Sequence, residues 1–282
     1  MARIKSLAVL AQGGGNDYLS ELYGAVIENI QKEGISSKLK NTQLSGNPTS
    51  GTVEAKRFEN RTFQPYGTAR GAGAGTKVTA EPVTIAIDQD REIITEIEDK
   101  DVALYGVDGF LERQSAMDQK SMERELEKAF FTESALKGTF MTPSGTDIVD
   151  KIEALIQAVE TVSNDYVEGV DRDDIAVVLK PSVYGQLRTY IDKVTDGGAE
   201  GEEIAKFHGV EIYSSVYLPK TDGKTTANNI NYGVVMAKGA VAQPVRPIVK
   251  PAEQIPLSNA VATGLFYSYG TKAVSPDLIF VA

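Results

Sequence analysis

The segment from Asn41 to Glu81 constrains the fold more than any other part of the chain. Its apolar residues are sparse, and six glycines interrupt its short β-prone stretches, namely Gly46, Gly51, Gly67, Gly71, Gly73 and Gly75. Such a pattern indicates strands joined by turns, so we predict a long β-hairpin. Because the hairpin has too little apolar surface for a core of its own, it must lie outside the main core, and a neighbouring chain must order it.

Two predicted strands and a long helix follow the hairpin. Residues 83–88 alternate apolar and polar side chains, and residues 91–99 continue as a second strand, so both are expected in a sheet that anchors the hairpin. From Asp108 to Phe131 no helix breaker occurs after Gly109, and the apolar residues fall on one stripe. The sequence therefore predicts a long amphipathic helix with a densely charged outer face. A shorter amphipathic helix is predicted from Asp17 to Lys32.

Predicted strands and helices alternate in the middle of the chain. A helix is expected from Ile148 to Val162, a buried strand from Ile175 to Leu179, and a further helix that Pro181 opens. An acidic, glycine-rich loop follows, and more strands are expected at residues 210–215, at residues 232–237 and within 261–282. The order of elements predicts a mixed α/β fold, of the α+β class, with the hairpin outside it.

Composition excludes several classes of function. The 282 residues are 41% hydrophobic, which is enough for a sizeable core. The absence of Cys excludes disulfides, thiolate nucleophiles and zinc sites that need sulfur. A net charge of −10 disfavours a protein whose main role is to grip nucleic acid. No secretory signal or membrane helix is expected, which favours a soluble chain made in the cytoplasm.

The chain offers no recognisable catalytic constellation. His208 is the single histidine and precedes a predicted strand, where a turn or edge position is expected. The run Gly71 to Thr76 lacks the Gly-Lys-Ser/Thr ending of a phosphate loop and is interpreted as a hairpin tip. Asp171 to Asp174 lacks the spacing of a calcium loop. We therefore expect no catalytic residue, no cofactor and no metal.

The order of elements resembles the major capsid proteins of tailed bacteriophages, the Hong Kong 97-type capsid fold, along nearly the whole chain. The segments that carry the resemblance are VTIAIDQDREIITEIEDKD, LKPSVYGQLRTYID, FHGVEIYSSVYLP, MAKGAVAQP and FYSYGTKAVSPDLIFVA. The resemblance implies an N-terminal arm over residues 1–42, an extended loop over 43–82, a peripheral domain over 83–145 and 238–282, and an axial domain over 146–237. Residues 108–133 would form the spine helix of the peripheral domain.

The resemblance also implies a function and partners. The chain would self-assemble into hexamers and pentamers of an icosahedral shell in the host cytoplasm and end in the virion capsid, around non-specifically packaged double-stranded DNA. A separate scaffolding protein and a portal would assist, with no membrane involved. Two alternatives stay open: an encapsulin-type nanocompartment, which has the same fold around an enzyme cargo, and a soluble α/β enzyme whose site is unrecognised.

Charge predicts where subunits touch. Residues 51–80 carry a net charge of +3, from five basic residues, Lys56, Arg57, Arg61, Arg70 and Lys77, against two acidic ones. Residues 99–133 carry a net charge of −4, with Glu112, Asp118, Glu123 and Glu127 on the spine helix. Opposite charge predicts that the loop of one subunit lies across the spine helix of the next. The resemblance further places the acidic loop, with Asp196, Gly197, Gly198, Glu200, Glu202 and Glu203, at a capsomer axis.

Overall fold

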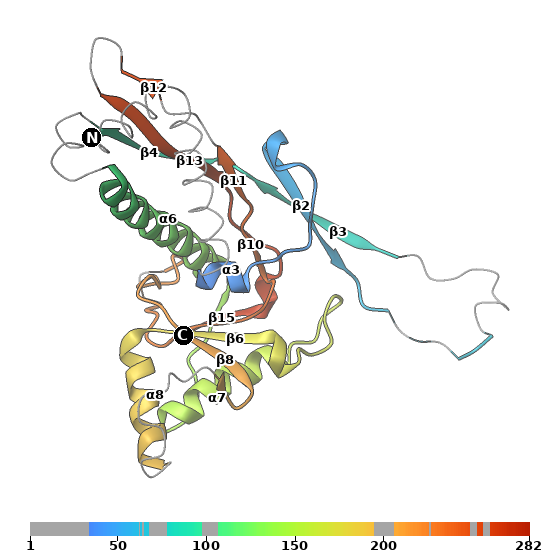
Figure 1. Cartoon of the computed structure of the whole chain (residues 1–282). Coiled ribbons are helices and arrows are strands. Elements are labelled where there is room, and N and C mark those ends of the chain that lie inside the picture. The colour runs from blue at the N-terminus through green and yellow to red at the C-terminus, as the bar shows by residue number, and fades with distance from the viewer. Residues whose placement is uncertain are drawn as a thin grey trace.

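The computed structural model describes residues 34–61, 63, 65–67, 78–97, 107–194, 206–225, 227–248, 253–255 and 260–282. Three predicted features lie outside this part of the chain: the helix at residues 17–32, the hairpin tip with Arg70 and Lys77, and the acidic loop at residues 196–203. The described elements form three parts, which Figure 1 shows: an α/β sheet with two helices, a peripheral sheet beside a long helix, and a projecting hairpin.

A six-stranded sheet forms the largest core. Its order is β5 (Thr139–Phe140), β15 (Ile279–Val281), β9 (Gly233–Ala237), β6 (Ile175–Leu179), β8 (Val210–Ser214) and β7 (Lys206–Phe207). Strand β6 runs parallel to β8 and antiparallel to β9, and all five of its residues are buried. Helix α7 (Ile148–Glu160) contacts β9, β15 and β6, and α8 (Pro181–Val194) contacts α7. The strand predicted at Ile175 to Leu179 is confirmed, as are both helices.

The peripheral sheet is built around β13 (Val261–Tyr269). Strands β4 (Gln89–Ile97), β11 (Val245–Ile248) and β12 (Glu253–Gln254) all pair with it antiparallel. Helix α6 (Val107–Lys137) covers one face of this sheet, where Met122 and Leu126 pack against alternate residues of β13. The predicted spine helix is therefore confirmed, and it ends at Lys137. No helix among the described residues is long and apolar enough to cross a membrane.

The C-terminal part of α6 links the two cores. Phe130 and Phe131 are fully buried in the core of the six-stranded sheet and meet edge to face, with ring centroids 5.5 Å apart. Gly138 follows the last residue of the helix, and a larger residue does not fit there because a Cβ would lie 2.7 Å from the carbonyl oxygen of Ser134. The apolar stripe therefore changes its partner along the helix, from the peripheral sheet to the α/β core.

The projecting hairpin consists of β2 (Thr52–Phe58) and β3 (Ala80–Ala86), with β1 (Leu44–Ser45) at its edge. Residues 83–88 were expected to form a separate anchoring strand, but residues 80–86 are the returning strand of the hairpin itself. The physical reason is that Val53, Ala55 and Ile85 bury together against Ala242 and Val274. The base of the hairpin thus packs against its own subunit. The sparse apolar residues had predicted a hairpin that lies wholly outside the core.

Short elements complete the fold. Helix α3 (Ile35–Leu39) contacts α6, and β10 (Val241–Ala242) pairs with β14 (Lys272–Ala273). Three single-turn helices lie at Pro48–Ser50, Arg172–Asp174 and Pro276–Leu278.

Candidate assembly interface

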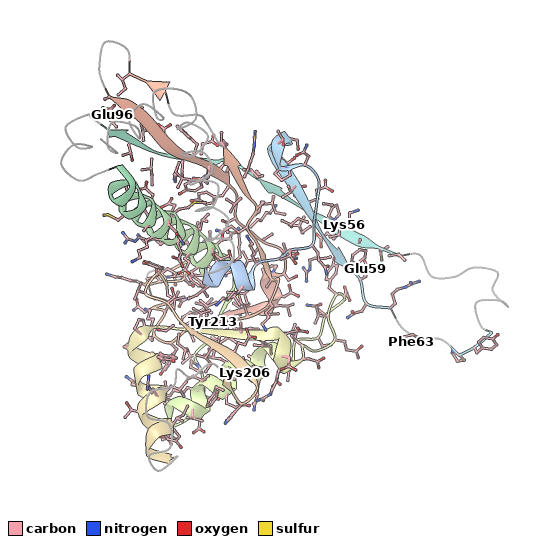
Figure 2. All side chains as sticks on the ribbon, in the orientation of Figure 1. Lys56, Glu59, Phe63, Glu96, Lys206 and Tyr213 are labelled. Atoms are coloured by element: carbon pink, nitrogen blue, oxygen red, sulfur yellow. The ribbon has the colours of Figure 1, made fainter. Side chains whose placement is uncertain are left out.

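The outer part of the hairpin exposes large apolar side chains. Phe63 and Tyr66 are fully exposed, and Phe58 and Val78 are more than half exposed. Figure 2 shows Phe63 far from the body of the subunit, while Lys56 and Glu59 lie nearer the base of the hairpin. Soluble monomers seldom gather exposed apolar groups on one projecting element, so this surface is suited to contact with another chain.

The base of the hairpin is held by a clasp of polar contacts, which we define as Arg57, Glu81, Tyr166 and Asp277. Nη2 of Arg57 donates to both carboxylate oxygens of Asp277 at 2.8 Å. The guanidinium carbon of Arg57 lies 4.2 Å from the ring centroid of Tyr166, whose hydroxyl donates to Glu81 at 2.9 Å. These contacts fix the direction in which β2 and β3 leave the subunit.

The predicted basic residues of the loop therefore occupy different environments. Lys56 is exposed on the outer face of the hairpin, opposite Pro82 in register. Arg57 points inward and its charge is neutralised within the subunit. Arg61 is exposed beyond the end of β2, and Arg70 and Lys77 lie outside the described residues.

The predicted acidic residues of the spine helix are largely used inside the subunit. Glu127 is buried and accepts hydrogen bonds from the backbone N–H of Ile35, at 3.0 Å, and from the Ser215 hydroxyl, at 3.4 Å. Burial raises the pKa of the Glu127 carboxyl. Asp118 is buried as well and accepts from Gln114 at 3.0 Å. Neither residue is an exposed charge within the subunit, and their predicted contact with the loop of a neighbouring subunit stays a prediction.

Other acidic residues of α6 also contact residues of their own subunit. Glu125 accepts from Arg91 and from the Tyr269 hydroxyl, both at 3.1 Å, and Glu133 accepts from the backbone N–H of Ala273 at 3.3 Å. Glu123 is partly buried, and the side chain of Glu112 lies outside the described residues. Sequence charge predicted a net sign for the helix but not which face carried it.

The exposed side of α6 between Ala116 and Thr132 is basic. Between Ala116 and Thr132, the exposed residues are Ala116, Met117, Lys120, Ser121, Arg124, Lys128 and Thr132. The three charged residues stand at i, i+4 and i+8, which places them along one side of the helix. The buried Met122 and Leu126 lie on the opposite side, against β13. We call Lys120, Arg124 and Lys128 the basic stripe.

The peripheral sheet has a second face, away from α6. Glu92, Ile94 and Glu96 are exposed there on β4, in register with Phe266, Gly264 and Ala262 of β13. Figure 2 shows Glu96 near the far end of this sheet. We call this the outer sheet face. The sequence predicts a strand at residues 91–99 but not which of its side chains lie on this face.

The single histidine lies in the turn between β7 and β8, as expected. His208 Nδ1 is 3.0 Å from Oε2 of Glu153, and Arg172 joins Glu153 and Glu160 of α7. Burial opposes ionisation of Glu153, but hydrogen bonds from Arg172 and His208 outweigh it and lower its pKa. These contacts hold the turn between β7 and β8 against α7. No group of three or more His, Asp or Glu among the described residues is placed to hold a metal ion.

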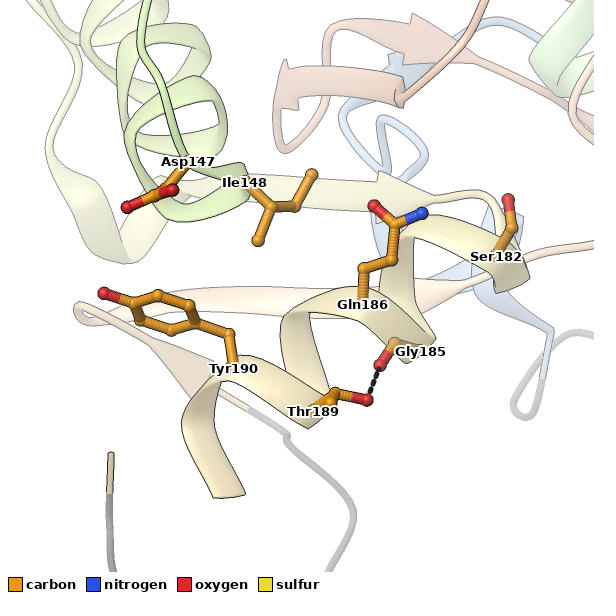
Figure 3. Close-up of a pocket in the computed structure, with 7 residues that line it drawn as sticks. All are labelled: Asp147, Ile148, Ser182, Gly185, Gln186, Thr189 and Tyr190. Carbon is orange, nitrogen blue, oxygen red and sulfur yellow. Dashed lines mark hydrogen bonds between the residues drawn. The ribbon is translucent and has the colours of Figure 1, made fainter. Parts of the chain in front are cut away.

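A shallow groove of about 470 Å³ lies between the start of α7 and the exposed side of α8. Figure 3 shows Gln186 and Tyr190 of α8 extending toward Ile148 and Asp147, while the Thr189 hydroxyl donates to the Gly185 carbonyl. The described residues that line the groove include no histidine, lysine or arginine, and Asp147 is used to cap α7.

These elements define the Hong Kong 97-type capsid fold: a projecting hairpin, a spine helix beside a peripheral sheet, and a helix-bearing α/β sheet. The predicted fold class is confirmed. No family model and no curated protein matches the chain.

Several solved structures share the fold of this chain. A chain from Mycobacterium phage Che8 has a TM-score of 0.60 at 18% identity, covering 88% of this chain and 90% of that one. The capsid structure of cyanophage P-SCSP1u has a TM-score of 0.57 at 19% identity, covering 88% and 87%. A virus-like particle from Pyrococcus furiosus has a TM-score of 0.58 at 12% identity, covering 94% and 98%.

Proposed function

We propose that this chain is the major capsid protein of a tailed phage, a structural subunit that assembles into a closed shell in the host cytoplasm and becomes part of the virion. The observation that carries the proposal is the projecting hairpin, whose outer apolar side chains have no covering within the described part of the subunit. The shared fold with phage capsid structures supports it. Hexamers and pentamers of one chain would form the shell, with the acidic loop at residues 196–203 near their axes.

The hairpin docks on the outer sheet face of a neighbouring copy, in place of the spine helix that net charge favoured. Phe58, Phe63 and Val78 supply apolar surface, and Lys56 supplies positive charge. The outer sheet face offers an exposed Ile94 between the carboxylates of Glu92 and Glu96. Apolar groups would supply the affinity of this contact, and the opposite charges would set its register.

The shell would enclose double-stranded DNA, assisted by a scaffolding protein and a portal. A second candidate is an encapsulin-type compartment around a protein cargo. The structural match to the virus-like particle from Pyrococcus furiosus favours it, because the match covers 98% of that particle's chain. The two functions share every assembly contact described above. They differ only in what the closed shell contains.

Electron microscopy of the purified full-length chain tests the proposal. Closed shells, or hexameric and pentameric rings, are expected at assembly concentrations. A chain that stays monomeric at high concentration with a protease-resistant hairpin would overturn the proposed function. Nuclease-protected DNA inside particles from infected or lysogenic cells supports a phage capsid, whereas a single abundant protein inside supports a compartment.

A further inference from the structure

The basic stripe of α6 is unusual for a chain of net charge −10. Its three side chains are exposed, and none of them forms an ion pair with a residue that the structure describes. Two acids of the same helix have partners elsewhere, Glu127 with Ile35 and Ser215, and Glu125 with Arg91 and Tyr269, whereas Glu123 lies between Lys120 and Arg124 in the lining of a groove. Between Ala116 and Thr132, the charged residues of α6 that are exposed to solvent are therefore all cationic.

We propose that the basic stripe contacts the phosphate backbone of the DNA enclosed by the shell, an inference that rests on the proposed function. Residues four apart on a helix are separated by about 6 Å along its axis. Phosphates of one DNA strand rise about 3.4 Å each along the duplex axis, and because the strand winds around that axis, successive phosphates are separated by about twice that distance. Lys120, Arg124 and Lys128 therefore match a strand lying along α6.

The side chains of the basic stripe are suited to bind a polyanion such as DNA without recognising its base sequence. Long flexible cations without an ordered acceptor beside them form phosphate contacts but cannot select a base. Three contacts per subunit are weak alone and are screened by salt. Many subunits act together in a shell, and weak contacts suit a polymer that must be packed tightly and later released.

An acidic protein segment is the competing occupant, because a groove of about 360 Å³ lies beside the stripe. Lys120 and Arg124 line it together with Ile35, Val216 and Tyr217. Lys128 does not line the groove and lies one turn further along α6. A peptide in the groove would contact two of the three cations, whereas a DNA strand along the helix contacts all three. Lys128 therefore discriminates between the two occupants.

The test measures binding of a fluorescent 30-base-pair duplex to the purified full-length chain across a salt series. The variants are Lys128→Gln alone and the triple substitution Lys120→Gln, Arg124→Gln and Lys128→Gln, because Gln keeps the helix. A matched triple control, Lys206→Gln, Lys220→Gln and Lys272→Gln, removes the same charge from exposed positions elsewhere. The slope of log K against log salt should fall by about 1 for the single variant and about 3 for the stripe variant. Affinity in 50 mM salt should fall at least about tenfold for the stripe variant, and about twofold or less for the control.

Each result decides the proposal. Equal salt slopes for the stripe variant and the control would overturn it, as would loss of binding to a poly-glutamate peptide by the stripe variant with duplex binding intact. Electron microscopy of the same preparations keeps the two claims apart. Shells with an unchanged duplex slope contradict the basic stripe alone, whereas a missing shell in the unsubstituted chain contradicts the proposed function.

Discussion

Nη2 of Arg57 donates to both carboxylate oxygens of Asp277 at 2.8 Å, which ties the base of the hairpin to a residue 220 positions later in the chain. The arginine side chain is 13% exposed and the aspartate 27%, so solvent screens this ion pair less than a surface pair. A residue that net charge assigned to a neighbouring subunit thus holds its own subunit together. The contact sets the starting direction of an element that must reach another chain.

Substitution of this pair should couple stability to hairpin order. Arg57→Gln and Asp277→Asn should each destabilise the subunit, and a double-mutant cycle should give a coupling energy of about 1–2 kcal/mol, because the pair is partly buried and charge-assisted. Chemical denaturation measures the coupling, and hydrogen exchange of β2 and β3 amides should accelerate in both single variants. Additive effects of the two substitutions would show that the clasp is not an energetic unit.

Disulfide trapping should locate the docking surface of the hairpin. The chain has no Cys, so introduced cysteines are the only thiols. Cysteine at Phe58, Phe63 or Val78 combined with Ile94→Cys on the outer sheet face should give covalent subunit ladders on non-reducing gels after assembly. The disulfide requires Cα atoms within about 7 Å, so ladders report direct apposition.

The matched control for this experiment replaces Ile94→Cys with Met117→Cys. Met117 is exposed on α6, so it tests the spine helix as the docking surface with the same hairpin cysteines. Ladders are expected with Ile94→Cys and not with Met117→Cys. The reverse pattern would return the hairpin to the spine helix.

Helices and strands with a strong local sequence pattern were predictable. The partners of their charged side chains were not. The buried strand Ile175 to Leu179 and the breaker-free helix after Gly109 follow from apolar periodicity alone. The partners of Glu127 and Arg57 lie 88 and 220 residues away, at Ser215 and Asp277, and no local pattern encodes such distances. Net charge over a segment sums over all faces of an element, so it did not predict that the exposed side of α6 between Ala116 and Thr132 is basic.

Glu127 should make stability depend on pH. Its folded-state pKa is raised by burial, so the folded state retains a proton that the unfolded state has lost. The free energy of unfolding therefore falls as pH rises from the usual glutamate value through the raised folded value. Glu127→Gln keeps an oxygen that can accept from Ile35 but cannot ionise, so this variant should lose less stability over that pH window. Parallel slopes for the variant and the unsubstituted chain in urea denaturation would refute the assignment.

Two glycine-to-alanine substitutions should change the free energy of unfolding in opposite directions, because an added Cβ clashes at one position and has room at the other. At Gly270, a Cβ would lie 1.9 Å from the carbonyl oxygen of Ala86, where the turn after β13 meets the link between β3 and β4. Gly270→Ala must force these backbones apart and should destabilise the subunit by roughly 1–3 kcal/mol or more.

Gly185 is the matched case, since it lies inside α8 and its Cβ would meet nothing within 4 Å. Gly185→Ala should stabilise the subunit by about 0.5–1 kcal/mol, because glycine loses more backbone entropy in a helix than alanine does. Urea denaturation of both variants under non-assembling conditions measures the two signs. Because the Gly270 contact lies between the peripheral sheet and the hairpin, Gly270→Ala should also accelerate hydrogen exchange in β2 and β3, while Gly185→Ala leaves it unchanged. A neutral Gly270→Ala would mean that the hairpin base tolerates displacement from the sheet, and the clasp at Arg57 and Asp277 would then be its main constraint.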